Sequence, residues 1–365
     1  MSNLCLEIKE YLKTFNTHST QVSKFCYNRN IEKRRRFGLI MFKKYIPGLG
    51  LSLAIAALAT FLGKAFPLFG SSVFAILLGI LLNHFWKIPQ KFHPGLAFSG
   101  KKLLQYSIIL LGFSLSISKV SATGLSSLKI SILTILLAFL SAYLIGRFLG
   151  MGRVLTLLIG FGTAICGGSA IAAASPILEA KEEEIALSIS TIFFFNILAV
   201  FIFPFLGHVM QMSAETFGTW AGTAINDTSS VVAAGYTYGQ TAGDLATIVK
   251  LSRALMIVPA CLIFAGVRYI KSQSSKQKVD LKKIFPWFIL WFVCASLISS
   301  TGVLPASFIS FTKILSQWLM AMALAGIGSR VSFAQFKQAG AAPLLTGAFA
   351  WFVVAVSSLI IQYFF

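Results

Sequence analysis

The chain has 365 residues, of which 56% are hydrophobic and only 12% are charged, and its mean hydropathy is +0.81. The apolar residues come in runs of about 18 or more, the length at which a helix crosses a bilayer, rather than in amphipathic stripes. This composition excludes a soluble globular protein. The net charge of +20 therefore does not indicate a nucleic-acid partner, but raises the question of which loops carry the charge.

The N-terminal segment 1–44 differs from the rest because it is polar and carries the basic run EKRRRF. It lacks a compact apolar region followed by a small-residue cleavage site, so it does not match a signal peptide. We expect a basic cytoplasmic tail here and a transmembrane domain at 45–365. An alternative is that the natural chain starts at Met41, just before the apolar sequence.

Eleven apolar segments are candidate membrane spans. They run at about 46–66, 68–86, 102–118, 125–147, 153–175, 184–206, 216–237, 243–269, 284–302, 309–329 and 341–363. With a cytoplasmic N-terminus, most basic residues fall in cytoplasmic segments, as the positive-inside rule requires. This alternation holds only if the fifth and seventh segments both cross, and it places the acidic run at 179–184 outside. We therefore expect an all-α, multi-pass membrane protein with its C-terminus outside.

No cofactor or metal site is predicted. The five cysteines form no Cys-x-x-Cys pair, and the four histidines lie in the tail or near the ends of spans. No Walker sequence is present, so ATP does not drive the protein directly. Because no motif of a soluble enzyme appears, we expect the protein not to be an enzyme.

The fifth segment reads GFGTAICGGSAIAAASP at 160–176 and contains residues that interrupt a helix. A helix broken inside the bilayer leaves free N–H groups at the start of its second half, and such groups bind anions. The predicted binding residues are Thr163, Cys166, Gly167, Gly168 and Ser169. The alternative is that the small residues only pack two helices closely.

The seventh segment contains AGTAINDTSSVVAAGYTYG at 221–239. Five consecutive polar residues lie inside it: Asn226, Asp227, Thr228, Ser229 and Ser230. An ionisable residue inside a span is a functional candidate by default, so a second broken helix with Asp227 at its centre is predicted. The alternative is a surface loop with no seventh span.

The eighth segment carries Lys250 and Arg253, which are three residues apart and share a helix face. They would lie about 10 and 15 Å inside the outer end of this helix. Snorkelling to the surface is an alternative for Lys250, but a poor one for Arg253. The pair requires an anion, which we expect to be Asp227, a bound substrate, or each in turn, and Pro259 is expected to kink the same helix.

A weak internal similarity pairs the segment from Lys102, KLLQYSIILLGFSLSISKV, with the segment from Lys313, KILSQWLMAMALAGIGSRV. In the predicted topology the two segments run in opposite directions, as inverted repeats of transporters do. Chance similarity between two apolar helices is the alternative. Gly326 and Gly328 in the tenth segment indicate either a further break or a plain small-residue helix end.

Several of these stretches occur in the order of one known family. IPGLGLSLAIA, LLGFSLS, GFGTAICGGSAIAAASP, AGTAINDTSSVVAAG and IVKLSRALMIVP together resemble the YeiH family (UPF0324) of bacterial inner-membrane proteins, often described as sulfate exporters. The resemblance covers about Tyr45 to the C-terminus. It implies a fold like that of cation/proton antiporters and bile-acid transporters, with inverted repeats and broken helices that cross near the bilayer midplane.

The sequence thus predicts a secondary transporter of a small anion, such as a sulfur oxyanion or a sulfonate. The anion is expected at the helix break, with charge supplied by Arg253 and Lys250, while Asp227 takes up H⁺ or Na⁺ as the coupling ion. Membrane lipid is the other expected partner, and a homodimer stays open. The alternatives are a cation antiporter that uses Asp227, and a membrane enzyme or scaffold that transports nothing.

Overall fold

A computed structural model of the chain describes residues 44–66, 70–271, 284–331 and 340–364. The predicted tail, apart from Lys44, and the alternative start at Met41 lie outside these residues. Every regular element in the described ranges is a helix, which confirms the all-α class. Six helices are long and apolar enough to cross a membrane: Lys44–Ala65, Ile117–Phe148, Glu182–Val209, Gln240–Val267, Ala306–Gly328 and Ala341–Phe364.

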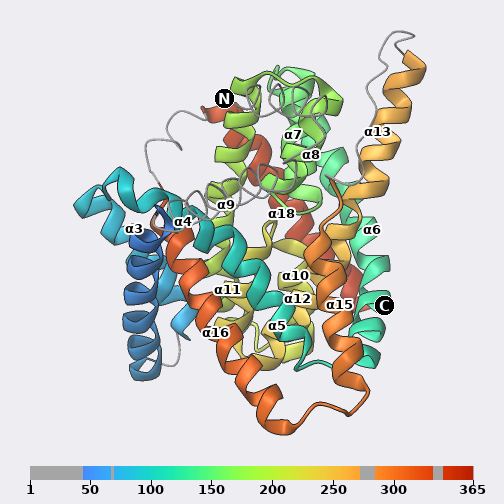
Figure 1. The fold of residues 1–365 in the computed structure, drawn as a ribbon. Helices are drawn as coiled ribbons and strands as arrows, with labels where there is room; N and C mark the ends of the chain where they lie inside the picture. The colour runs from blue at the N-terminus through green and yellow to red at the C-terminus, as the bar shows by residue number, and fades with distance from the viewer. Residues whose placement is uncertain (1–43, 67–69, 272–283, 332–339, 365) are drawn as a thin grey trace, which may run out of the picture.

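One side of the molecule is a panel formed by the helix Lys44–Ala65, α3 (Gly70–Trp86) and α16 (Ala306–Gly328) (Figure 1). Helix α16 is unbroken up to Gly328, and a Cβ at Gly328 would lie 2.2 Å from the carbonyl oxygen of Ile76 on α3. The glycines of the tenth segment therefore serve close helix packing, because only a residue without Cβ permits this approach.

A second layer joins this panel to the rest of the chain. After the short η1 (Gln90–Phe92), the elements α4 (His93–Phe98), η2 (Ser99–Leu103) and α5 (Leu104–Gly112) follow one another without a gap and pack against α16. The hydroxyl of Ser316 donates to the carbonyl oxygen of Ser107 at 2.7 Å, so the two segments of the predicted repeat lie side by side. Helix α15 (Trp287–Ser300) packs on α5 and on α6.

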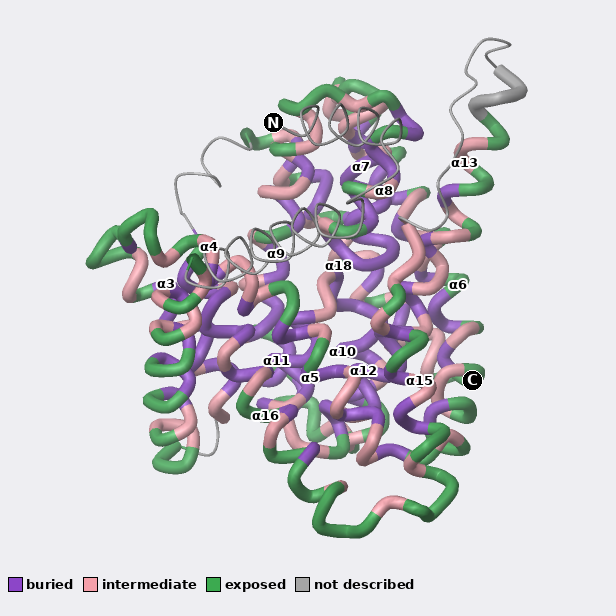
Figure 2. The backbone as a smooth tube through the Cα atoms, viewed as in Figure 1, coloured by how far each residue is buried: buried purple, intermediate pink, exposed green. Residues whose placement is uncertain are grey.

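The body of the molecule is built around four long helical segments. These are α6 (Ile117–Phe148), α9 (Glu182–Val209), α12 (Gln240–Leu255) with its continuation α13 (Ile257–Lys271), and α18 (Ala341–Phe364). The helix is interrupted at Met256 between α12 and α13, three residues before Pro259, as the lack of an N–H in proline predicts. The most buried backbone runs through the centre of this body (Figure 2).

The fifth predicted span is a helical hairpin rather than a crossing helix. It consists of α7 (Arg153–Ala164) and α8 (Gly168–Leu178), which we call the first hairpin. A Cβ at Gly162, near the end of α7, would lie 3.0 Å from the side chain of Ile171, one turn into α8. Both arms contact α9 and lie in the upper part of Figure 1, at the same end of the molecule.

The seventh predicted span is a second hairpin, formed by α10 (Ala214–Ala224) and α11 (Thr228–Tyr238). The ring of Phe217 at the start of α10 stacks on the ring of Tyr238 at the end of α11, with centroids 3.9 Å apart. The hydroxyl of Tyr238 donates to the carbonyl oxygen of Met212 just before α10. This hairpin begins and ends at the end of the molecule opposite to the first hairpin (Figure 1).

The two hairpins belong to a repeated unit. Each is followed by a long helix, α9 or α12 with α13, and the first unit enters from the end opposite to the second, as in inverted repeats. The tips share the sequence Gly-Thr-Ala-Ile, at 162–165 and again at 222–225. The predicted pairing of 102–120 with 313–331 did not identify this repeat.

The predicted breaks are therefore in the correct places, but the course of the chain after them differs from the prediction. A chain with five small or polar residues at a break can reverse as readily as continue, because the backbone groups at the tip find partners in either case. Because the two reversals cancel, the segments before the first hairpin and after the second hairpin keep the predicted sides of the membrane relative to each other. Only the residues between the hairpins change side, which brings the acidic run at 179–184 to the side of Arg147 and Arg153.

Candidate functional site at the hairpin tips

The tips of the two hairpins meet inside the body of the protein. A Cβ at Gly167 would lie 3.4 Å from the Cβ of Asp227 and 3.6 Å from the Nδ2 of Asn196 on α9. The arms have 12 and 11 residues in the first hairpin and 11 each in the second. Such arms are about 17 Å long, which is half of a bilayer core, so the tips lie near its middle.

Lys250 on α12 joins the two tips. Its fully buried ammonium group donates to the carbonyl oxygens of Ile165 at 2.8 Å and Ile225 at 2.7 Å. These two isoleucines occupy the same position of the repeated Gly-Thr-Ala-Ile sequence, directly after the last residue of α7 and of α10. One side chain thus binds equivalent atoms of both hairpins.

Arg253, one turn further along α12, bridges the same two hairpins and α6. Its Nε donates to the carbonyl oxygen of Ala164 at 2.6 Å, and its Nη1 donates to the hydroxyl of Thr134 at 3.0 Å and to the carbonyl oxygen of Thr223. The last carbonyls of a helix have no partner within it and carry partial negative charge. The two cations therefore neutralise the C-terminal ends of α7 and α10, and neither lines the pocket described below.

The helix N-termini at the two tips, those of α8 and α11, are stabilised differently. Asp227 is the N-cap of α11: its Oδ2 accepts from the backbone N–H of Ser229 at 2.9 Å and from the Ser229 hydroxyl, while its own N–H donates to the Oδ1 of Asn196 at 3.1 Å. At the equivalent position before α8 stands Gly167, which has no side chain to cap the helix. The first N–H groups of α8 therefore retain their partial positive charge.

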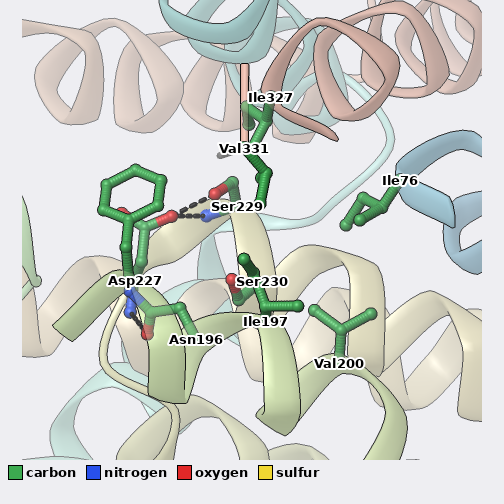
Figure 3. A pocket seen from close by; sticks show the side chains of 10 residues that line it. Ile76, Asn196, Ile197, Val200, Asp227, Ser229, Ser230, Ile327 and Val331 are labelled. Carbon is green, nitrogen blue, oxygen red and sulfur yellow. Dashed lines mark hydrogen bonds between the residues drawn. The ribbon is translucent and has the colours of Figure 1, made fainter. Parts of the chain in front are cut away.

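A small pocket lies beside the start of α11 and next to the start of α8 (Figure 3). Its polar wall consists of Asn196, Asp227, Ser229 and Ser230. Its apolar wall consists of Ile76 on α3, Phe193, Ile197 and Val200 on α9, and Ile327 and Val331 at the end of α16. The pocket thus lies where the body meets the panel.

The start of α8 adjoins this pocket. A Cβ at Gly168 would lie 4.0 Å from the ring of Phe193, which lines the pocket. Residues 161–167 are all buried, whereas Gly168 is half-buried and Ser169 is exposed. The start of α8 is therefore accessible, while the end of α7 is buried against α12.

Several buried polar atoms around the tips have no hydrogen-bond partner among the described residues. They are the Thr163 hydroxyl, both polar atoms of the Asn226 amide, the Asn196 Nδ2 and the Arg253 Nη2. Leaving such an atom unpaired costs about 1–3 kcal/mol, so groups of this kind usually serve a ligand, an ion or water. The Asn196 Nδ2 is the one that belongs to a residue lining the pocket.

The structure brings most of the predicted site residues together. Thr163, Cys166, Gly167, Gly168, Ser169, Asn226, Asp227, Thr228, Ser229 and Ser230 all lie at or next to the two tips. Lys250 and Arg253 reach the tips from the opposite side and hold backbone carbonyls. In this structure the carboxylate of Asp227 binds Ser229 rather than Arg253.

Sequence reasoning missed Asn196. It is 2% exposed on α9, and its amide lies between the two tips. The signal was present, because Asn196 is the single polar residue of the stretch FFFNILAVF at 193–201. A lone amide in an apolar span needs a partner inside the protein, and this requirement points to the nearest break in a helix.

These features define a class: a multi-pass α-helical membrane protein in which two opposed hairpins meet beside a pocket with one polar wall. Residues 47–347 match the family model described as conserved hypothetical protein 698. The chain is 44% identical over 323 residues to a UPF0324 membrane protein of Streptococcus pneumoniae, covering 86% of this chain and 96% of that protein. It is 40% identical over 339 residues to one of Clostridium tetani, covering 89% and 98%. The chain belongs to this UPF0324 family, which confirms the resemblance.

Proposed function

We propose that the protein is a secondary transporter that carries a small anion across the membrane and binds it in the pocket at the hairpin tips. The observation that carries this proposal is the N-terminus of α8, which has no side-chain cap and lies next to a pocket with one polar wall near the bilayer middle. A helix N-terminus with free N–H groups is a general anion-binding element, and transporters place such ends at the midplane.

The donors in the pocket and at the adjoining start of α8 suit an oxyanion. The N–H groups of Gly168 and Ser169, the Nδ2 of Asn196 and the hydroxyl of Ser230 can all donate to it, whereas the apolar wall restricts its size. Sulfur oxyanions and sulfonates present several acceptor oxygens around one centre and fit this arrangement of donors. Asp227 is the residue for a coupling ion, H⁺ or Na⁺.

Access to the pocket changes, in this proposal, by movement of the body against the panel. Lys250 and Arg253 fasten both hairpins to α12, so the hairpins move together with the body. The pocket lies at the boundary with α3 and α16, which is where such movement would open or close it.

The orientation follows from the charges. Arg147, Arg153 and Lys181 lie at the ends of α6, α7 and α9 that flank the first hairpin, and so at one end of the molecule. We propose that this end faces the cytoplasm of a bacterium, because loops rich in lysine and arginine stay on the inner side. The chain would then start inside and end outside.

The test measures anion binding and flux in a variant that adds a negative charge to the pocket. Asn196→Asp keeps the oxygen that accepts from Asp227 but replaces the unpartnered donor by a second acceptor with negative charge. We expect it to abolish the increase in melting temperature that sulfate or methanesulfonate gives the purified protein, and to abolish uptake of labelled sulfate into proteoliposomes. Gln211→Glu adds the same charge at an exposed turn and should leave both intact.

The alternatives give different results in the same assay. A cation antiporter would exchange Na⁺ for H⁺ without any anion, and Asn196→Asp would not abolish the exchange. A membrane enzyme or a scaffold would show no flux of any of these solutes in the intact protein. Either result would replace the anion-transport proposal.

A further inference from the structure

We propose that the anion and a cation bind together, because Asp227 must be neutralised by H⁺ or Na⁺ before the α8 terminus can accept an anion. This inference rests on the proposed function and assigns its coupling. The protein would then carry the anion and its coupling cation in the same step and in the same direction.

Asp227 lies next to the first tip, where the anion is proposed to bind. Asp227 faces Gly167, since a Cβ on that glycine would touch the Cβ of Asp227 at 3.4 Å. Its Oδ2 accepts from Ser229, so the group lies at the start of α11, on the polar wall of the same pocket. An anion bound to the first N–H groups of α8 would therefore lie beside this carboxylate.

No cation forms an ion pair with the carboxylate of Asp227 within the described residues, although Lys250 lies near enough to interact with it electrostatically. The charged and titratable groups near Asp227 are Lys250 and Arg253 on α12 and the thiol of Cys166 in the first tip. Lys250 is held by two carbonyl oxygens, and Arg253 by carbonyl oxygens and Thr134. Asp227 is the one titratable residue that lines the pocket, whose other walls are amide, hydroxyl or apolar.

The repeat shows that the two tips differ at this position. Gly167 and Asp227 are equivalent residues, each two positions after the shared Gly-Thr-Ala-Ile sequence. The first tip has no side chain at this position and offers bare N–H groups, whereas the second carries a carboxylate. One tip is suited to an anion and the other to a cation, and the unpartnered Asn196 Nδ2 lies between them.

The experiment measures the affinity of the purified protein for sulfate and for methanesulfonate, whose charges do not change between weakly acidic and weakly alkaline pH. Affinity is compared at both pH values, with Na⁺ and with N-methylglucamine as the cation. In the unaltered protein we expect acid or Na⁺ to raise the affinity about tenfold or more, because a carboxylate beside the bound anion repels it in a protein interior.

Two variants remove the carboxylate and keep a good helix cap. Asp227→Asn and Asp227→Ser both retain an oxygen that can accept from the N–H of Ser229. We expect them to bind the anion tightly at every pH and without Na⁺. Asp244→Asn on α12 is the matched control, since Asp244 accepts from Tyr236 and Gln240 outside the pocket, and its dependence on pH and Na⁺ should equal that of the unaltered protein.

The outcomes separate the two proposals. Anion affinity that is independent of both pH and Na⁺ in the unaltered protein overturns the inference, and so does loss of anion binding in both folded Asp227 variants. If no anion binds to the unaltered protein or to either variant under any condition, the proposed function itself is wrong.

Discussion

Lys250 and Arg253 show how a buried charge can serve structure inside a membrane. Ionisable residues in a span usually mark a substrate or ion pathway, and the sequence predicted that role here. Both side chains are fully buried, and every partner that they have in the structure is a carbonyl or hydroxyl oxygen. A hairpin tip exposes helix-end carbonyls that only donors from another helix can satisfy, and α12 supplies them.

Lys250→Met tests this role. The substitution leaves the carbonyls of Ile165 and Ile225 without a donor, although it also removes the cost of burying a charge. We expect a net loss of about 2 kcal/mol in stability, seen as a lower melting temperature of the purified protein in detergent. Lys313→Met, at an exposed position of α16, should change stability by less than about 0.5 kcal/mol. Equal melting temperatures for the two variants would show that the bridge contributes nothing.

Gly167→Ala tests the shape of the first tip. Gly167 has φ +67° and ψ −132°, where a residue with Cβ is strained, and its Cβ would also touch Asp227. We expect a loss of about 1–3 kcal/mol in stability. The neighbouring Gly168→Ala is the control, because Gly168 begins α8 and its Cβ would meet nothing closer than 4.0 Å. If Gly167→Ala had the same melting temperature as Gly168→Ala, the backbone at Gly167 would not be strained by a side chain.

At the scale of elements, the sequence located both breaks but not the hairpins. Glycine and clustered polar residues mark where a helix stops, so Gly167 and the stretch around Asp227 were predictable. Whether the chain then continues or reverses depends on tertiary contacts such as Phe217 with Tyr238, which no local pattern encodes. Counting charges did not help, because two reversals cancel. The shared Gly-Thr-Ala-Ile at 162–165 and 222–225 was the overlooked evidence that the segments are equivalent.

Gly222→Ala tests how α10 packs on α12. A Cβ at Gly222 would lie 2.7 Å from both the carbonyl oxygen of Ala246 and the Cβ of Val249, so the helices would have to separate. We expect a loss of about 1–3 kcal/mol through overpacking, measured as a lower melting temperature. Gly266→Ala in α13, where a Cβ would meet nothing within 4 Å, should be neutral or gain up to about 1 kcal/mol from helix propensity. If both variants lost similar stability, the close packing of α10 on α12 would not explain the effect of Gly222→Ala.

At the scale of the whole molecule, the hairpins decide which loops share a side of the membrane. If both segments crossed, the loop at 179–181 would lie opposite to Arg147, and the turn at 210–213 would lie on the side of Arg147. With two hairpins the relations are reversed, because the first hairpin returns to its side of entry and α9 then crosses. Both topologies bury the same sequences in the membrane. They can be distinguished only by the side of the membrane on which the loops at 179–181 and 210–213 lie.

Single-cysteine labelling in right-side-out and inverted vesicles measures that sidedness. In a chain without its native cysteines, Arg147→Cys, Glu183→Cys and Gln211→Cys each place one thiol at an exposed position. We expect a membrane-impermeant maleimide to label the first two from one face and the third from the other. The first position is a fixed reference, because it precedes both hairpins. Labelling of positions 147 and 211 from one face, with 183 on the other, would mean that both segments cross. The pocket would then lose the two opposed helix ends on which its anion and cation sites depend.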